Sequence, residues 1–178
     1  RAAAAIDAGF FESQNAPVPV KKRREMIDFT RDEHPKAATA EGLATLRPVF
    51  QKDGSVTAGN ASGLNDGAAA IVLATADAAA KAGLNPMFRI IGYAHAGVSP
   101  DVMGIGPVPA VRNLFEKTGL TAGDFDVIES NEAFASQALA VSKELGLDPA
   151  RVNPNGGAIA LGHPVGATGA IITVKAMY

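Results

Sequence analysis

The feature that most constrains the fold of this chain is a glycine-rich stretch at residues 153–170, NPNGGAIALGHPVGATGA. Its glycines allow backbone to approach backbone, or a ligand, closely. The pattern predicts a tight turn, a short apolar strand, a second turn with His163, and a helix that begins at Pro164, where the missing N–H of proline costs nothing. The free N–H groups of that helix would face His163. His163 is thus a candidate acid, base or oxyanion donor, although an ordinary strand–helix turn would have the same pattern.

A second unusual segment is residues 57–67, TAGNASGLNDG, in which Leu64 is the only large apolar side chain. Such a segment can add little to a core, so it favours a binding loop over a purely structural loop. Ser62 lacks the flanking glycines of a nucleophile elbow. The segment also lacks the lysine of a phosphate-binding P-loop.

From residue 68 onward, short apolar runs alternate with segments of helical pattern. The predicted strands are residues 68–75, 88–95 and 125–130. The predicted helices are residues 77–82, capped by Asp77, then 109–119, and 131–145, capped by Ser130 or Asn131. Between the second strand and the second helix, residues 96–109 are rich in Gly and Pro and predict a shaped loop. The alternation predicts a layered α/β fold. Asn131 lies at a strand-to-helix corner, where a simple capping role is the plainest interpretation.

The N-terminal third predicts smaller elements. They are a helix at residues 1–11 that closes near Gly9, two strands around 18–20 and 27–29 of a small hairpin, a helix at 39–46 capped by Thr39, and a turn at 52–55. The hairpin turn carries the only basic cluster, residues 21–24. A solvated hairpin tip is the favoured interpretation of that cluster, because binding to nucleic acid or a membrane surface needs a broader basic face.

Composition excludes several kinds of site. The chain has no cysteine, so disulfides and thiolate metal sites are absent. Its three histidines are isolated in sequence, and we expect no metal site. The net charge is −2, and no apolar run is long enough to span a bilayer. Without a secretory signal, we expect a cytoplasmic protein that binds neither nucleic acid nor membrane. Both ends look cut, so we expect an internal piece of a longer protein.

Four segments together resemble the thiolases, most closely the biosynthetic acetyl-CoA acetyltransferases. They are GNASGLNDGAA at 59–69, MGIGPVPA at 103–110, NEAFA at 131–135 and NGGAIALGHPVGATGA at 155–170. The resemblance implies part of a five-layered αβαβα fold built from two similar halves. It further implies that residues 1–64 end a coenzyme A-binding loop domain, residues 65–85 complete the N-terminal half, and residues 86–178 form most of a truncated C-terminal half.

The resemblance also implies a chemistry. Thiolases condense two acetyl-CoA molecules to acetoacetyl-CoA, or run the reverse thiolytic cleavage. One cysteine carries the acyl group and a second moves the Cα proton. His163 would help to activate the nucleophile and to hold the thioester oxygen, and Asn131 would hold a water at the same oxyanion site, so both should face one small polar cavity. Because this chain has no cysteine, the two thiols would lie before residue 1 and beyond Tyr178, and we expect the chain alone to be inactive.

By the same resemblance, acyl-CoA is a substrate and no cofactor is permanently bound. The implied coenzyme A contacts are Ser62, Ala58, Phe50, Met103, Phe134 and Lys36, of which Ser62, Met103 and Phe134 should line one continuous groove. The full-length protein would be a homodimer or homotetramer of fatty acid metabolism. Two alternatives stay open: a degradative 3-ketoacyl-CoA thiolase of fatty-acid β-oxidation, and a non-catalytic thiolase-like protein that binds acyl-CoA.

Overall fold

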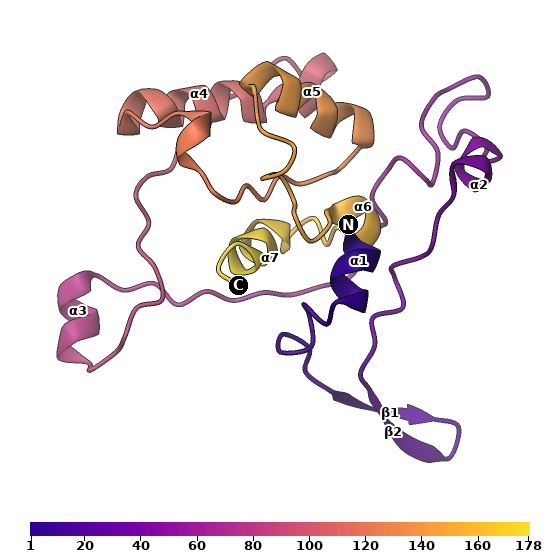
Figure 1. Ribbon diagram of the computed structural model, residues 1–178, viewed down its shortest axis with the longest axis horizontal. Helices are drawn as coiled ribbons and strands as arrows, with labels where there is room; N and C mark the ends of the chain where they lie inside the picture. The colour runs from indigo at the N-terminus through magenta and orange to yellow at the C-terminus, as the bar shows by residue number, and fades with distance from the viewer.

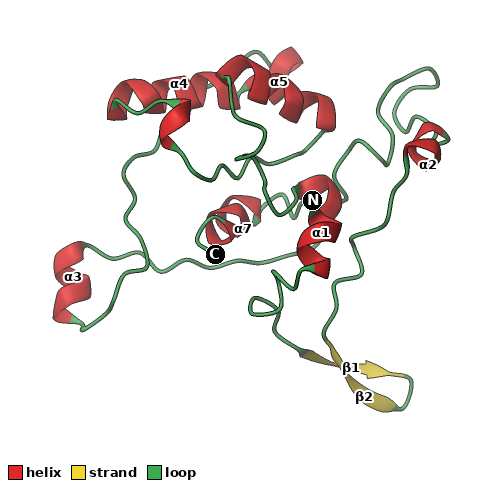
Figure 2. Ribbon diagram, viewed as in Figure 1, coloured by secondary structure: helices red, strands yellow, loops and turns green.

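The computed structural model describes residues 1–178, and it arranges short helices and one two-stranded sheet along an open path (Figure 1). The elements are α1 (Ala2–Asp7), β1 (Val18–Lys22), β2 (Glu25–Phe29), α2 (Ala40–Ala44), α3 (Ala76–Lys81), the 3-10 helix η1 (Pro100–Ile105), α4 (Pro107–Thr118), the 3-10 helix η2 (Ala122–Asp124), α5 (Ala135–Leu145), α6 (Ala158–Leu161) and α7 (Thr168–Lys175). Helices α4 and α5 pack together, and the β1–β2 hairpin projects away from them. Long loops connect the elements (Figure 2).

The N-terminal elements agree with the sequence patterns. Helix α1 is followed by Gly9 in the left-handed region (φ +75°). Strands β1 and β2 pair antiparallel from Val18 opposite Phe29 to Lys22 opposite Glu25, with the basic cluster at the turn. Thr39 caps α2, because its hydroxyl accepts a hydrogen bond from the Gly42 N–H.

The longer helices exist as predicted, but their starts differ. Helix α4 begins at Pro107 rather than Pro109, because η1 leads directly into it. Helix α5 begins at Ala135 rather than at Asn131, and neither Ser130 nor Asn131 caps it. The reason is that residues 131–134 run extended beside residues 60–62: the Ser62 N–H donates to the Ala133 carbonyl at 3.0 Å.

Three further details concern the cap of α3, the ends of α4 and α5, and the loop at residues 96–109. Thr75 caps α3 in place of the predicted Asp77. Glycine ends α4 and α5 as predicted, at Gly119 (φ +73°) and Gly146 (φ +62°). The predicted loop at 96–109 contains η1 and the first turn of α4.

The three predicted strands after residue 67 are wrong as strands. Residues 68–75 and 88–95 pair with nothing, and residues 125–130 keep one isolated parallel bridge, between Ile128 and Val152. A strand needs a neighbour to take its N–H and C=O groups, and the chain offers none to the first two segments. Their apolar side chains are exposed: Val72 is 91% and Tyr93 is 78% exposed.

The glycine-rich stretch is also built differently from its prediction. Residues 158–161 form the helix α6 instead of a strand, as the good helix formers Ala and Leu allow. Helix α7 is assigned from Thr168 rather than from Pro164. The turn after His163 is nevertheless helical in its bonding, because the N–H groups of Ala167 and Thr168 both donate to the Pro164 carbonyl at 2.8 Å.

Little of the chain is buried. The accessible surface is 13,080 Å², whereas a compact monomer of 18.1 kDa would expose about 8,100 Å². Only ten residues are buried, and the six apolar ones among them are alanines and valines. None of the helices is both long enough and apolar enough to cross a membrane.

Candidate active site

The structure brings His163 and Asn131 together, although they are 32 residues apart. Asn131 Nδ2 lies 3.3 Å from His163 Nε2, and both residues are partly buried. Neither Asn131 nor the residue before it caps α5, so the amide is free to point at the imidazole. The contact is direct, so a water shared by the two side chains would sit beside the pair rather than between these two atoms.

The other ring nitrogen of His163 is paired as well. His163 Nδ1 lies 2.7 Å from the hydroxyl of Thr168, which is 7% exposed. The same hydroxyl lies 2.9 Å from the carbonyl oxygen of Pro164. Because both ring nitrogens have a polar partner, the orientation of the imidazole ring is fixed.

The backbone of His163 is fixed by the loop at residues 57–67. The His163 N–H donates to Asn65 Oδ1 at 3.0 Å, and the Asn65 amide nitrogen lies 3.3 Å from His34 Nδ1. Gly162 makes this approach possible: its φ is +97°, and a Cβ there would meet Asn65 Oδ1 at 2.8 Å. The loop thus contributes an amide that orients the histidine.

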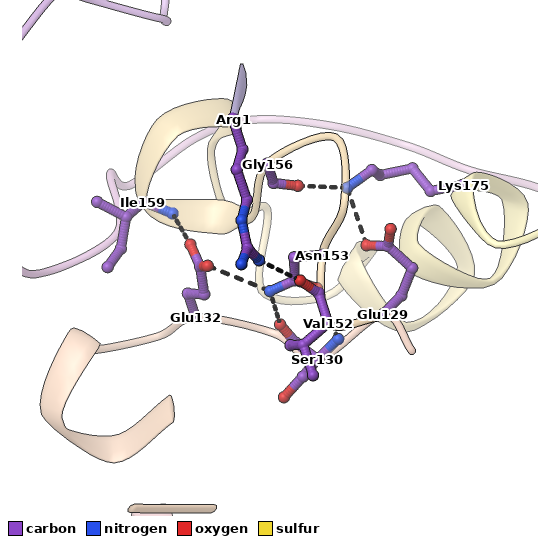
Figure 3. Close-up of polar contacts among 9 residues, drawn as sticks. All are labelled: Arg1, Glu129, Ser130, Glu132, Val152, Asn153, Gly156, Ile159 and Lys175. Carbon is purple, nitrogen blue, oxygen red and sulfur yellow. Dashed lines mark hydrogen bonds and ion pairs between the residues drawn. The ribbon is translucent and has the colours of Figure 1, made fainter. Parts of the chain in front are cut away.

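A buried asparagine holds the segment that carries Asn131 against the segment that leads to His163 (Figure 3). Asn153, which is 3% exposed, accepts from the Ser130 N–H at 2.8 Å and donates to the Ser130 carbonyl at 2.8 Å and to Glu132 Oε1 at 3.1 Å. Glu132 in turn accepts from the Ile159 N–H at 3.2 Å. The residues on both sides of Asn131 are therefore tied to the turn before α6.

Two basic side chains, Lys175 and Arg1, lie beside these residues (Figure 3). Lys175 of α7 donates to Glu129 Oε2 at 2.9 Å and to the Gly156 carbonyl at 2.8 Å, and the Glu129 side chain is only 6% exposed. Arg1 donates to the carbonyls of Val152 and Pro149. We refer below to Asn153, Ser130, Glu132, Glu129 and Lys175 as the asparagine frame.

A cavity of about 660 Å³ opens beside Asn131, between η1, α4, α5 and the extended residues 125–131. Met103 and Phe134, two of the predicted coenzyme A contacts, line it together with Asn131. Its wall is mostly apolar, which suits an acyl or pantetheine chain more than the phosphates of coenzyme A. Two buried oxygens in its lining residues, Asn131 Oδ1 and Gln137 Oε1, have no hydrogen-bond partner.

The remaining predicted contacts are placed less closely. Ser62 does not line the cavity, although its backbone pairs with Ala133 and the neighbouring Ala61 bridges Phe134. Phe50 is 73% exposed, and Ala58 and Lys36 are also exposed; none of the three lines the cavity. The structure thus brings Met103, Phe134 and Asn131 to one cavity, but Ser62 is not part of its lining, so the predicted continuous groove of Ser62, Met103 and Phe134 is not formed. His163 does not line this mostly apolar cavity either, so it is not the small polar cavity predicted for Asn131 and His163.

Sequence reasoning missed the residues that orient the site. Thr168 had a signal, since a hydroxyl five residues after His163 can fold back on the ring once the intervening turn is helical. Asn65 belongs to a segment that was assigned to binding, but its contact with the His163 backbone spans 98 residues. Asn153 and Glu132 had no separate signal, because their contacts depend on the path of the whole turn.

Comparison with known proteins adds the context. The family model described as "Thiolase, C-terminal domain" matches residues 84–178, and "Thiolase, N-terminal domain" matches residues 1–77. The beta-ketothiolase BktB of Cupriavidus necator is 58% identical over 180 residues, covering 100% of this chain and 46% of that protein. The acetyl-CoA acetyltransferase of Escherichia coli (strain K12) is 55% identical over 179 residues, covering 100% and 45%.

A solved structure has a similar backbone. The crystal structure of the Bacillus anthracis acetyl-CoA acetyltransferase superposes with a TM-score of 0.91 at 55% identity, over 99% of this chain and 45% of that one. The chain therefore spans about half the length of the curated relatives that it matches.

Proposed function

The chain belongs to the thiolase family and has the thiolase fold, and on this premise we propose that it is the part of an acetyl-CoA C-acetyltransferase that holds the substrate thioester. The whole protein would condense two acetyl-CoA molecules to acetoacetyl-CoA, or run the reverse cleavage. The observation that carries the proposal is the contact of 3.3 Å between Asn131 Nδ2 and His163 Nε2. It joins two polar side chains from distant segments, and one of them, Asn131, lines a mostly apolar cavity.

His163 would act as a base toward a cysteine outside these residues. The S–H bond breaks, the proton goes to Nε2, and the sulfur electron pair attacks the carbonyl carbon of acetyl-CoA. Coenzyme A then leaves as a thiolate and takes the proton from Nε2. A neutral imidazole is the group that nucleophilic catalysis needs beside a thiol.

Asn131 and His163 would together stabilise the oxygen of the thioester when an enolate forms beside it. Fixed hydrogen donors at a developing oxyanion are commonly the largest catalytic contribution, and loss of one such donor typically costs about a hundredfold to a thousandfold in kcat. Support comes from the buried frame around Asn131, since such donors act only if they are held in place.

For coenzyme A, we place the pantetheine chain along Met103 and Phe134, with Ser62 near their cavity. Phe50, Ala58 and Lys36 are exposed in this chain, and we expect them to contact coenzyme A in a protein of the relatives' full length. The division at residues 64 and 85, a homodimeric or homotetrameric assembly, a role in fatty acid metabolism and a cytoplasmic location belong to the same proposal.

The test uses a swap protein, in which these 178 residues replace the matching segment of the Escherichia coli acetyl-CoA acetyltransferase. Thioester exchange needs a thiolate, and this chain has no cysteine. We therefore expect acetoacetyl-CoA cleavage with free coenzyme A from the swap protein and none from the 178-residue chain.

The variant His163→Ala of the swap protein should lose about a hundredfold or more in kcat. His95→Ala is the matched control, because the His95 side chain is exposed and makes no hydrogen bond. Turnover by the short chain, or equal effects of the two histidine variants, would contradict the proposed function.

A further inference from the structure

Nδ1 of His163 contacts the Thr168 hydroxyl, and the role inferred for this contact rests on the proposed function. In that function Nε2 has two tasks: it must offer a lone pair to a thiol, and it must offer a hydrogen to a thioester oxygen. The base step turns His163 into an imidazolium with a hydrogen on both nitrogens, and the imidazole is neutral again once coenzyme A has taken the proton. Because a neutral imidazole has one nitrogen of each kind, its Nε2 can accept in one step and donate in the next only if the ring can adopt both tautomers. Each tautomer needs a suitable partner at Nδ1.

The first tautomer carries its hydrogen on Nδ1. In that state Nδ1–H donates to the Thr168 hydroxyl at 2.7 Å, and the hydroxyl donates onward to the Pro164 carbonyl at 2.9 Å. Nε2 then has a lone pair, which accepts from the Asn131 amide at 3.3 Å. This is the state in which the histidine can take a proton.

The second tautomer carries its hydrogen on Nε2. The Thr168 hydroxyl rotates so that its hydrogen points to Nδ1. The Pro164 carbonyl loses little by this, because it keeps the two backbone N–H donors of Ala167 and Thr168, both at 2.8 Å. Nε2–H then faces the Asn131 amide, whose unpartnered Oδ1 can turn to accept it.

We propose that Thr168 is a positioning residue whose hydroxyl pairs with Nδ1 of His163 in both neutral tautomers, so that Nε2 can serve as an acceptor in one and a donor in the other. A hydroxyl can do this because it is both donor and acceptor, whereas a carboxylate or carbonyl only accepts. Thr168 is 7% exposed, so solvent does not take its place.

A purely structural role is the competing explanation. Threonine in a helix often bonds the carbonyl four residues before it, as Thr168 does with Pro164. The chain has a matched control for that role: Thr173, in the same helix, donates to the Gly169 carbonyl at 2.8 Å and makes no hydrogen bond to a histidine. Thr173→Val removes the back-bond alone, and Thr168→Val removes the back-bond and the partner of Nδ1.

The direct readout is the tautomer itself, measured from the ring ¹⁵N shifts of the swap protein labelled at histidine. The signals of His163 are those lost in His163→Gln. We expect both tautomers in the unaltered swap protein, in Thr168→Ser and in Thr173→Val, and a clear change of their ratio in Thr168→Val. An unchanged ratio in Thr168→Val would overturn the proposal.

The swap protein gives a second, kinetic readout. Thr168→Val should lower kcat about tenfold or more, part of the hundredfold to ten-thousandfold typical of acid–base groups, with the KM for acetoacetyl-CoA unchanged. Thr168→Ser should restore kcat to within about threefold of the unaltered protein. Equal losses in Thr168→Val and Thr173→Val, or no rescue by serine, would overturn the role of Thr168. Failure of the proposed function is a different result: full activity in His163→Ala, whatever the tautomer ratio.

Discussion

Two stretches that both look like buried strands in the sequence differ sharply in the structure. Residues 125–130 lie against the turn before α6, where the Ile128 N–H donates to Arg151 and the Asn153 N–H donates to Ile128, both at 2.9 Å. Residues 68–75 have no such neighbour, and their Val72 and Leu73 are 91% and 69% exposed. The first stretch continues directly into the site at Asn131, whereas the second leads to α3, away from α4 and α5 (Figure 1).

The difference separates the segments that are held by contacts within these 178 residues from those that find no partner among them. The asparagine frame fixes the segment of Asn131 by hydrogen bonds within this chain. Asn65 and Thr168 do the same for His163. The apolar runs need an adjacent strand and a covering layer, because an exposed strand edge leaves its backbone groups unpaired. The contact between Asn131 and His163 can therefore form in a chain whose apolar runs have no strand partner.

The largest effect should come from the centre of the frame. Asn153→Ala leaves the Ser130 N–H, the Ser130 carbonyl and the Glu132 carboxylate without their partner, and it places alanine at a positive φ of 45°. In the swap protein we expect a loss of about 3 to 4 kcal/mol in the free energy of unfolding, from denaturant titration. Asn155→Ala, which removes no side-chain hydrogen bond, should change the free energy of unfolding by no more than about 0.5 kcal/mol. Equal losses in Asn153→Ala and Asn155→Ala would contradict a specific contribution of the frame to stability.

A smaller effect should follow from loss of the ion pair between α7 and the Asn131 segment. Lys175→Met leaves the Glu129 carboxylate, 6% exposed, without its cation, which should cost about 2 to 3 kcal/mol of unfolding free energy in the swap protein. The double variant Lys175→Met, Glu129→Gln should recover part of that loss. Lys143→Met, at an exposed lysine without an ion pair, is the control; a similar loss there would deny the pair its role.

The exposed apolar stretch should respond in the opposite way. In the 178-residue chain, Val72→Lys should change the unfolding free energy by no more than about 0.5 kcal/mol and should reduce aggregation, measured by light scattering. Val141→Lys in α5, where the valine is 2% exposed, should destabilise the same chain strongly. If the two substitutions destabilise alike, residues 68–75 are packed in solution and the contrast fails.

The smallest effect concerns a polar contact at the start of the 125–130 stretch. The hydroxyl and then the backbone N–H of Thr121 donate to Asp124 at 2.7 Å and hold the pKa of its carboxyl below the ordinary 3.8. A lowered pKa stabilises η2 at pH values above 3.8, and the contribution is lost as the pH falls through the lower folded value. Thr121→Ala should bring the NMR titration midpoint of Asp124 back toward 3.8; a midpoint that does not move would contradict this.

How far the sequence could predict the structure follows the same division. Turn and cap chemistry is local, so the hairpin, the Thr39 cap and the glycine ends of α4 and α5 could be predicted. The resemblance to thiolases gave the fold and the pairing of Asn131 with His163. The apolar runs predict paired strands that the structure does not contain, because an apolar run does not show whether a neighbouring strand is present. Asn153 and Glu132 escaped prediction, because their contacts arise only when the turn at residues 153–157 is folded: a Cβ at Gly157 would overlap the Glu132 carboxylate.

The most direct test of the central claim is a double-mutant cycle on Asn131 and His163 in the swap protein, with kcat for acetoacetyl-CoA cleavage as the readout. If the two side chains act as one oxyanion site, each single change to alanine should lower kcat by about a hundredfold or more. The double variant should then be little worse than the poorer single variant, because residues that act as a unit are non-additive. Losses that multiply in the double variant would show that the two residues act independently, and would contradict a shared site.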